Sequence, residues 1–362
     1  MTIIDPKNWI RPEIQAISAY HVPDPGNMIK LDAMENPYTW PDDMIDEWQA
    51  LLKTTALNRY PDPSSRALQN KIRSAFHIPE NMDILLGNGS DEIIQIIAMA
   101  VAGPDRCILA PEPGFVMYKM IAGFVGMQYV GVPLRQEDFG LDMDAMRKAI
   151  ELHRPAVIFL AYPNNPTGNL FDPKQVEEII NLAPGLVVID EAYAAFADDS
   201  FMDKLGQFSN MLVMRTVSKM GLAGLRLGYL AGPAEWLNEF DKIRLPYNIN
   251  VLTQMSAEFA LEHKVVLDQQ TASLKSERSR VYEQLKTVSA LQVFPSQANF
   301  VLVRVIQGDV NQIFEQLKQA GILIKNLANS PGMLKNCLRL TIGKPEENDA
   351  LLEAIMQIVN AG

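Results

Sequence analysis

Cysteine, histidine and clustered basic residues are all scarce in this sequence, and each shortage excludes a class of protein. Its 362 residues include two cysteines, Cys107 and Cys337, too few for a disulfide framework and typical of a reducing compartment. The four histidines are scattered, without the spacing of metal ligands, so we expect no metal site. Acidic residues outnumber basic ones by 43 to 32, and the net charge of -11 argues against nucleic acid as a partner.

Long apolar runs are also missing. The longest charge-free apolar stretch, residues 93–103, is far shorter than the roughly 20 residues that span a bilayer. The first fourteen residues carry charges and prolines instead of the apolar core of a signal peptide. We therefore expect a soluble, cytoplasmic protein that does not bind membranes. With 48% hydrophobic residues, the chain is too apolar for disorder, and it is long enough for one large and one smaller domain.

The first two-thirds of the chain has the pattern of an α/β protein. Short apolar runs alternate with helical patterns and lack strict polar alternation, which is typical of strands covered on both faces of a mainly parallel sheet. The runs lie at residues 83–86, 107–110, 128–132, 156–160, 185–189 and 211–215. The expected fold class is therefore α/β, with a large, doubly wound, mainly parallel sheet.

The pattern changes after Pro246. A long helical stretch at 253–288 precedes a strand-helix-strand-strand-helix order, which predicts a smaller α+β domain. We assign residues 1–40 to an N-terminal arm that forms part of the small domain. Residues 41–250 form the expected large domain, and residues 251–362 the small C-terminal domain.

Five groups of polar residues lie just past the expected strands, where open α/β sheets bind ligands. The segment Gly87-Asn-Gly-Ser-Asp-Glu is a predicted turn before a buried helix, whose N-terminal N–H groups could hold an anion. The segment Tyr162-Pro-Asn-Asn-Pro-Thr-Gly follows the strand expected at 156–160. The segment Asp190-Glu-Ala-Tyr follows the strand at 185–189, which we expect to be buried. A turn or a helix cap would also explain each of these segments.

The remaining two groups contribute cations. Ser218-Lys219 stands among apolar residues, where burial would lower the pKa of the lysine and make its amine a nucleophile. Arg226 could hold a phosphate by two parallel hydrogen bonds. Taken alone, a lysine extending to solvent and an ordinary ion pair would account for them.

Together the five groups match the requirements of pyridoxal 5'-phosphate. A lysine forms a Schiff base with its aldehyde, and a carboxylate keeps its ring nitrogen protonated. An asparagine and a tyrosine can bond its phenolic oxygen, while a helix N-terminus and an arginine bind its phosphate.

The sequence resembles the fold-type I pyridoxal-phosphate aminotransferases, and more narrowly the histidinol-phosphate aminotransferase family, over nearly its whole length. The motifs that carry the resemblance are Leu31-Asp-Ala-Met-Glu-Asn-Pro, Asn58-Arg-Tyr-Pro-Asp, Gly87-Asn-Gly-Ser-Asp-Glu, Asn164-Asn-Pro-Thr-Gly, Asp190-Glu-Ala-Tyr, Ser218-Lys-Met-Gly-Leu-Ala-Gly-Leu-Arg-Leu-Gly and Cys337-Leu-Arg-Leu-Thr-Ile-Gly. Many class I and II aminotransferases share the Asn-Asn-Pro-Thr-Gly, Asp-Glu-Ala-Tyr and Ser-Lys blocks. The Arg-Tyr-Pro-Asp block and the Leu-Ala-Gly-Leu-Arg spacing narrow the resemblance to the one family.

The resemblance implies a role for each matched residue. Lys219 would be the Schiff-base lysine, Asp190 the partner of the ring nitrogen, and Tyr193 a further catalytic residue. The expected cofactor-binding residues are Ser90, Asp91, Phe115, Asn165, Asp190, Tyr193, Ser218, Lys219, Arg226 and, from a second subunit, Tyr60. The expected substrate-binding residues are Tyr20, Asn165, Lys325 and Arg339.

The sequence departs from the family pattern in two places. Phe115 stands where the family usually has a tyrosine stacked on the cofactor ring, so stacking remains and a hydroxyl is lost. Lys325 replaces a second substrate-binding arginine, and a lysine is a point charge rather than a planar fork. Glu35 and Asn36 lie in the family's arm motif, where turn capping is the alternative to a role in the site.

The resemblance implies transamination of L-histidinol phosphate with 2-oxoglutarate, giving imidazole-acetol phosphate and L-glutamate, by a homodimer with shared active sites. An aromatic amino acid aminotransferase, or a pyridoxal-phosphate decarboxylase of a phosphorylated amino acid, would share most of these residues. A non-catalytic binding protein or regulator of the same fold is the alternative from another class. The complete set of Lys219, Asp190, Asn165 and Arg226 argues against it.

Overall fold

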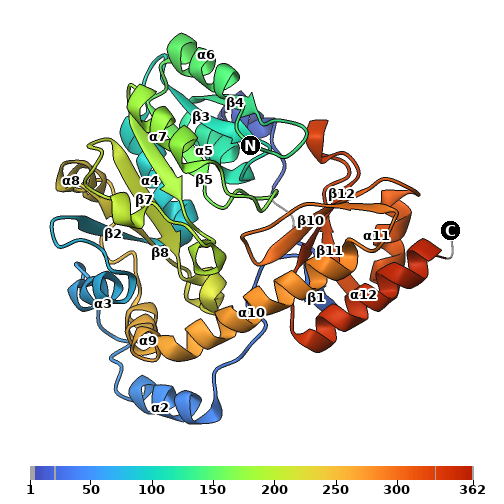
Figure 1. Ribbon diagram of the computed structural model, residues 1–362. Helices are drawn as coiled ribbons and strands as arrows, with labels where there is room; N and C mark the ends of the chain where they lie inside the picture. The colour runs from blue at the N-terminus through green and yellow to red at the C-terminus, as the bar shows by residue number, and fades with distance from the viewer. Residues whose placement is uncertain (1–4, 20–21, 331, 361–362) are drawn as a thin grey trace.

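The computed structural model describes residues 5–19, 22–330 and 332–360, and it shows a large part and a smaller part joined by one long helix (Figure 1). The expected α/β class is confirmed. The large part contains a seven-stranded sheet with the spatial order β2-β8-β7-β6-β5-β3-β4. Its strands are β2 (Asp83–Asn88), β3 (Cys107–Glu112), β4 (Gln128–Pro133), β5 (Val157–Ala161), β6 (Leu186–Asp190), β7 (Met211–Thr216) and β8 (Leu227–Gly232).

Six of these strands run in one direction, and β8 runs antiparallel to both of its neighbours. Strand β8 was not predicted, because its sequence contains two glycines, which are depleted in strand interiors. Gly228 is needed there: a Cβ at this position would lie 2.7 Å from the backbone carbon of Gly89. The glycine thus lets β8 pass close to the segment that follows β2.

Helices cover both faces of the large sheet, as the apolar strand sequences require. Along β6, Leu186 and Val188 pack into one core cluster, while Val187 and Ile189 pack into the other. The first face is covered by α4 (Gly89–Val101), α5 (Val116–Val125) and α8 (Ala234–Asp241). The second face is covered by α3 (Arg66–Phe76), α6 (Met143–His153), α7 (Pro173–Leu182) and α9 (Val251–Glu262).

The smaller part is built on a five-stranded sheet with the order β1-β11-β12-β10-β9. Its elements are β1 (Ile29–Leu31), β9 (Leu291–Val293), β10 (Phe300–Val305), α11 (Val310–Gln319), β11 (Ile322–Asn326), β12 (Cys337–Thr341) and α12 (Pro345–Asn360). Strand β1 comes from the N-terminal arm and pairs in parallel with β11. The arm therefore contributes a strand to the small sheet. The residues that follow β1 lie over the carboxyl ends of the strands of the large sheet.

The helical stretch expected at 253–288 consists of two helices. Helix α9 ends at Glu262, and α10 (Lys264–Leu285) starts after His263, whose backbone leaves the helical conformation. No proline or glycine marks this break in the sequence. Helix α9 packs against α3 in the core beneath the large sheet, and α10 crosses to the small part (Figure 1). Helix α10 thus connects the two parts, and the domain bounds at residues 40 and 250 stay predictions.

Two short helices complete the N-terminal region, α1 (Pro12–Gln15) and α2 (Asp42–Leu52). The Arg11 guanidinium at the start of α1 donates a hydrogen bond to the carbonyl of Phe124 in α5, which holds the arm on the large part. Within the described ranges, no helix is both long and apolar enough to cross a membrane. Nor do His, Cys, Asp and Glu side chains gather there in groups of three or more that could hold a metal ion.

Candidate active site

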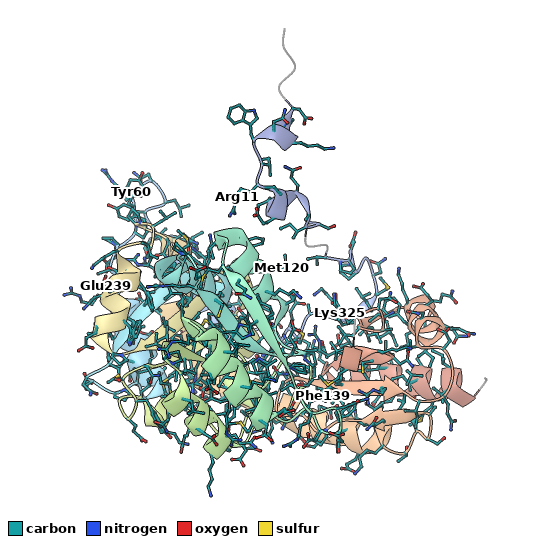
Figure 2. All side chains as sticks on the ribbon, turned by 90° about the horizontal axis from the view of Figure 1, so that it is seen from above. Arg11, Tyr60, Met120, Phe139, Glu239 and Lys325 are labelled. Atoms are coloured by element: carbon teal, nitrogen blue, oxygen red, sulfur yellow. The ribbon has the colours of Figure 1, made fainter. Side chains whose placement is uncertain are left out.

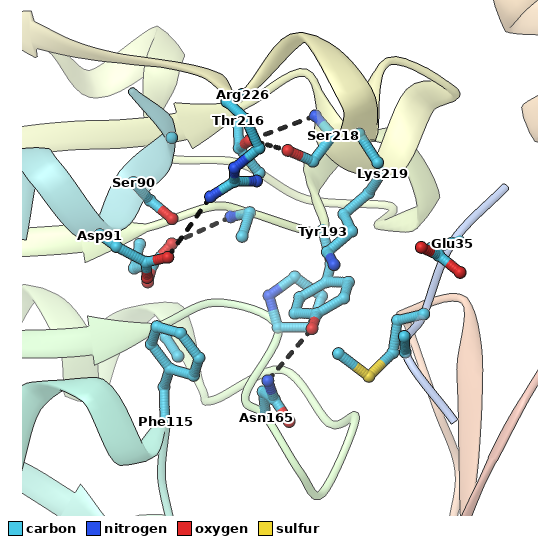
Figure 3. A pocket seen from close by; sticks show the side chains of 18 of the residues that line it. Glu35, Ser90, Asp91, Phe115, Asn165, Tyr193, Thr216, Ser218, Lys219 and Arg226 are labelled. Carbon is cyan, nitrogen blue, oxygen red and sulfur yellow. Dashed lines mark hydrogen bonds and ion pairs between the residues drawn. The ribbon is translucent and has the colours of Figure 1, made fainter. Parts of the chain in front are cut away.

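A cavity of about 420 Å³ opens at the carboxyl ends of β5, β6 and β7, between the large sheet and the arm (Figure 3). We call it the sheet-end cavity. Nine of the residues singled out from the sequence line it: Ser90, Asp91, Phe115, Asn165, Asp190, Tyr193, Ser218, Lys219 and Arg226. They come from five separate segments of the chain, and the parallel strands bring them together because their carboxyl ends share one edge.

One end of the cavity is built to receive an anion. The segment predicted as a turn is the end of β2 and the start of α4, which begins at Gly89, so Ser90 and Asp91 lie in its first turn. No side chain caps this helix start, which leaves its N–H groups directed at the cavity. Arg226 adjoins them, with its Nη2 atom 3.5 Å from the Asp91 carboxylate.

The backbone of Arg226 has an uncommon conformation. Arg226 has a φ of 49°, in the left-handed region that non-glycine residues seldom adopt. Thr216 supports the same end of the cavity, because its hydroxyl oxygen lies 2.8 Å from that of Ser218 and accepts the Ser218 N–H at 3.1 Å. Thr216 was not predicted as a site residue. It is the last residue of β7, and in the sequence it directly follows the mainly apolar run of that strand.

Lys219 projects from the turn after β7 toward the Tyr193 ring, with Nζ 5.8 Å from the ring centroid (Figure 3). Burial, together with the charges of Arg339 and Arg226, lowers the pKa of Lys219 from 10.5 to about 8, against the opposing effect of Glu35. At pH 7 about one-tenth of the amine is therefore uncharged, far more than for an unperturbed lysine. An uncharged amine at the wall of a cavity is the form that attacks a carbonyl carbon.

Asp190, the last residue of β6, is buried with both carboxylate oxygens hydrogen-bonded. Oδ1 accepts the N–H of Ala192 at 3.1 Å, and Oδ2 accepts the hydroxyl of Tyr118 at 2.6 Å. Burial raises the pKa of Asp190 to about 6, and these two bonds oppose the rise. Tyr118 was not singled out from the sequence, although it follows Phe115 at the i+3 spacing that places two residues on one side of a helix.

A chain of contacts joins Asn165 and Tyr193, which line the cavity, to Arg339, which is buried behind Asn165 and outside the lining. The Asn165 amide donates to the Tyr193 hydroxyl at 3.1 Å, and its carbonyl oxygen accepts from Arg339 Nη1 at 2.7 Å. Arg339 also donates to the backbone carbonyl of Asp32 at 3.0 Å, which ties β12 to the arm. Burial raises the pKa of Tyr193 well above its usual value, so its hydroxyl stays protonated.

Three predicted site residues lie elsewhere. Tyr60 is 81% exposed at the outer edge of the large part, stacked on Tyr247 at 4.5 Å (Figure 2). Lys325 is paired in register with Arg339 across β11 and β12, but it lies outside the lining of the sheet-end cavity. Tyr20 falls outside the described residues.

Glu35 and Asn36, the two arm residues whose roles the sequence left open, differ in their contacts. Glu35 lines the cavity and forms an ion pair of 2.5 Å with Lys30. Asn36 accepts the N–H of Tyr38 at 2.9 Å, so the turn-capping interpretation is confirmed for it.

Glu191 directs its carboxylate away from this cavity. The side chain is fully buried and accepts hydrogen bonds from Arg215 Nη2 at 2.7 Å and from the Ser200 hydroxyl at 2.9 Å. Successive residues of the Asp190-Glu191 pair therefore serve opposite sides of the sheet, one in the site and one in the core.

The sequence matches the family model described as Aminotransferase class I and II over residues 26–355. It is 52% identical over 347 residues to histidinol-phosphate aminotransferase 2 of Nitrosococcus oceani, which covers 96% of each chain. The histidinol-phosphate aminotransferase from Clostridium acetobutylicum has a similar structure, with a TM-score of 0.84 and 25% identity over 92% of this chain and 100% of that one.

The same fold occurs in the histidinol-phosphate aminotransferase from Sinorhizobium meliloti, whose structure was solved in complex with pyridoxal-5'-phosphate. The TM-score is 0.85 at 22% identity, over 98% of both chains. The order of the cavity residues along the chain, the family match and the 52% identity all agree. This chain therefore belongs to the class I and II aminotransferase family and, within it, to the histidinol-phosphate aminotransferases.

Proposed function

We propose that this protein transfers the amino group of L-histidinol phosphate to 2-oxoglutarate with pyridoxal 5'-phosphate as cofactor, in histidine biosynthesis. The products are imidazole-acetol phosphate and L-glutamate. The observation that carries the proposal is the sheet-end cavity, where a low-pKa lysine, a buried aspartate and a helix N-terminus with an arginine face one space. The relatives that share half of the sequence carry the same activity in their names.

The lining of the cavity fits the cofactor. Gly89 has a φ of +76°, a backbone conformation that favours glycine, and a Cβ there would lie 2.7 Å from Arg226 Nη2 and would displace the guanidinium from the helix start. Ser218 and the first-turn N–H groups of Ser90 and Asp91 would complete a phosphate site.

The ring of the cofactor has a matching set of partners. Phe115 supplies an apolar wall, and Asp190 supplies a carboxylate for the ring nitrogen. Asn165 and Tyr193 would bond the phenolic oxygen, because their amide and hydroxyl groups already share a hydrogen bond at the cavity wall. When bound, the cofactor supplies an electron sink that no protein side chain offers.

Lys219 and Arg339 have the two main side-chain roles, proton transfer and substrate binding. Lys219 would hold the cofactor covalently, and its free Nζ would then serve as general base and general acid for the proton of the substrate carbon. A pKa of about 8 suits this role, since the amine can gain and lose a proton near neutral pH. Arg339 would bind the phosphate of one substrate and a carboxylate of the other, because both anions accept two parallel N–H bonds.

We propose that the active unit is a homodimer with shared active sites. Apolar side chains that a lone subunit would expose to water support this assignment: Leu57 is 70% exposed, Tyr60 81% and Leu245 72%. Tyr60 would then reach the phosphate site of the neighbouring subunit. Cytoplasmic location stays a prediction, with which the two free, buried thiols agree.

The direct test combines the purified holoenzyme with L-histidinol phosphate and 2-oxoglutarate and quantifies both products by mass spectrometry. We expect glutamate and imidazole-acetol phosphate in equal amounts. Lys219→Ala should form neither, whereas Lys242→Ala, at an exposed lysine just past the end of α8, should match the wild type. Release of carbon dioxide from a phosphorylated amino acid, without any glutamate formed from histidinol phosphate, would assign the protein to the decarboxylases instead.

A further inference from the structure

Asp190 depends on a neighbour to which the family motifs gave no role. The Tyr118 hydroxyl donates to Asp190 Oδ2 at 2.6 Å, which is the distance of a strong, charge-assisted hydrogen bond. Asp190 itself is only 3% exposed and Tyr118 only 1%. Water therefore cannot take over this bond if the hydroxyl is removed.

The Tyr118 ring is held in place from two sides. It stacks on Phe159 with the ring centroids 4.7 Å apart, and it meets the edge of Phe115 at 5.5 Å. Phe115 lines the sheet-end cavity, so the residue that supports Asp190 also supports the apolar wall of the site. Burial and the adjacent Asp190 charge raise the pKa of Tyr118 well above its usual value, so the phenol remains the donor and the carboxylate the acceptor.

The charges around Asp190 do not keep it ionised on their own. Burial disfavours its charge, and the nearby carboxylates of Asp91 on α4 and of Glu191, the residue after β6, disfavour it further. The two donors bonded to Asp190, Tyr118 on α5 and the Ala192 N–H, act in the opposite direction. The other titratable groups that line this space are Glu35, Tyr193, Lys219 and Arg226.

We propose that Tyr118 is a positioning residue, whose hydroxyl keeps Asp190 ionised and fixes the rotation of its carboxylate toward the ring nitrogen of the cofactor. This inference rests on the pyridoxal-phosphate chemistry of the proposed function, but it does not depend on which amino donor is the natural one. With Oδ2 held by Tyr118 and Oδ1 by Ala192, the carboxylate cannot turn without breaking a buried hydrogen bond.

The test compares holoenzymes that carry Tyr118→Phe and Tyr162→Phe. Each variant removes one hydroxyl from a buried ring, since Tyr162 donates to Asp199 at 2.7 Å and lies outside the lining of the cavity. L-Glutamate serves as the amino donor in single turnovers, followed by the visible absorbance of the bound cofactor from pH 5 to pH 9. For Tyr118→Phe we expect a maximal rate about tenfold lower and the acidic limb of the rate profile about one pH unit higher. The KM for glutamate should change little.

For Tyr162→Phe we expect the acidic limb to coincide with that of the wild type. The proposal would be overturned if the acidic limb of Tyr118→Phe lay at the same pH as that of the wild type. It would also be overturned if the limb moved by the same amount in both variants. A wild type that shows no turnover with glutamate would contradict the proposed function instead. Combined with Asp190→Asn, Tyr118→Phe should add less than about a twofold further loss, because a residue that acts through Asp190 has nothing left to act on.

A second variant tests the same bond in the opposite direction. Site-specific replacement of Tyr118 by 3-fluorotyrosine keeps the ring and the hydroxyl but makes the phenol a stronger donor, so it also serves if Tyr118→Phe does not fold. The acidic limb should then move to lower pH. An unchanged limb, or a limb moved to higher pH, would refute the role of the hydroxyl.

Discussion

Lys219 is predicted to destabilise the cofactor-free protein, and replacing it by methionine should reveal by how much. Its pKa is about 8 in the folded chain and 10.5 when unperturbed. The folded pKa is the lower one, so folding disfavours the ammonium form. This cost is fully present below pH 8, falls as the pH rises from 8 to 10.5, and is gone above that range.

The size of the effect follows from the same two values. Each pKa unit corresponds to about 1.4 kcal/mol, so Lys219→Met should raise the free energy of unfolding by about 3 kcal/mol at pH 7. At pH 10 the gain should shrink to about 1 kcal/mol. These values are upper limits, because Lys219 is partly accessible to water in the cavity, which screens the charge. Methionine keeps the length of the side chain and removes the charge.

The assay is urea unfolding of both cofactor-free proteins at pH 7 and pH 10. Lys242→Met, at an exposed lysine paired with Glu239, is the matched control and should change the free energy of unfolding by less than about 0.5 kcal/mol at either pH. The reasoning fails if Lys219→Met gives the same gain at both pH values, or if the wild type is the more stable protein at pH 7.

Three further predictions concern the anion site, the core and the subunit contact. Arg339→Lys should raise the KM for glutamate at least about tenfold, because lysine cannot reproduce two parallel hydrogen bonds, and steady-state kinetics would show it. Glu191→Gln should lower the free energy of unfolding by about 3 to 5 kcal/mol in urea, because it leaves Arg215 buried without its partner charge. Tyr60→Ala mixed with inactive Lys219→Ala should regain up to about a quarter of the wild-type rate at saturating substrate, because half of the subunit pairs then hold one intact site.

Each of these has a clear contrary result. An unchanged KM in Arg339→Lys would remove the arginine from substrate binding. A Glu191→Gln protein as stable as the wild type would show that the buried ion pair does not contribute. Mixtures no more active than the Tyr60→Ala protein alone would mean that the subunits do not share their sites.

The sequence predicted most of the large sheet because its strands carry a signal that is local. An apolar run such as Val157–Ala161 is too short and too continuous for an amphipathic helix, so a strand buried on both faces is what remains. Strand β8 was missed because Gly228 serves the packing of Gly89 rather than the local pattern. The break at His263 could not be placed from the sequence, because no proline or glycine marks it.

The site was predictable to the extent that its residues follow strands. Asp190, Asn165 and Lys219 each lie just past a strand end, so a rule about sheet edges finds them without coordinates. Tyr118 lies on helix α5, and in the sequence it belongs to the apolar pattern of that helix. Its hydrogen bond to Asp190 depends on the packing of α5 against the end of β6, which the sequence does not reveal. Tyr60 cannot be judged from one chain, because its expected partner is a second subunit.

The measurement that tests the proposed function most directly is a single-turnover comparison of amino donors. Holoenzyme is mixed with L-histidinol phosphate, L-phenylalanine or L-tyrosine, and the loss of the visible absorbance of the bound cofactor is followed in time. The proposed function predicts the largest ratio of rate to half-saturating concentration for histidinol phosphate. Histidinol phosphate that reacts no faster than phenylalanine or tyrosine would contradict it and favour an aromatic amino acid aminotransferase.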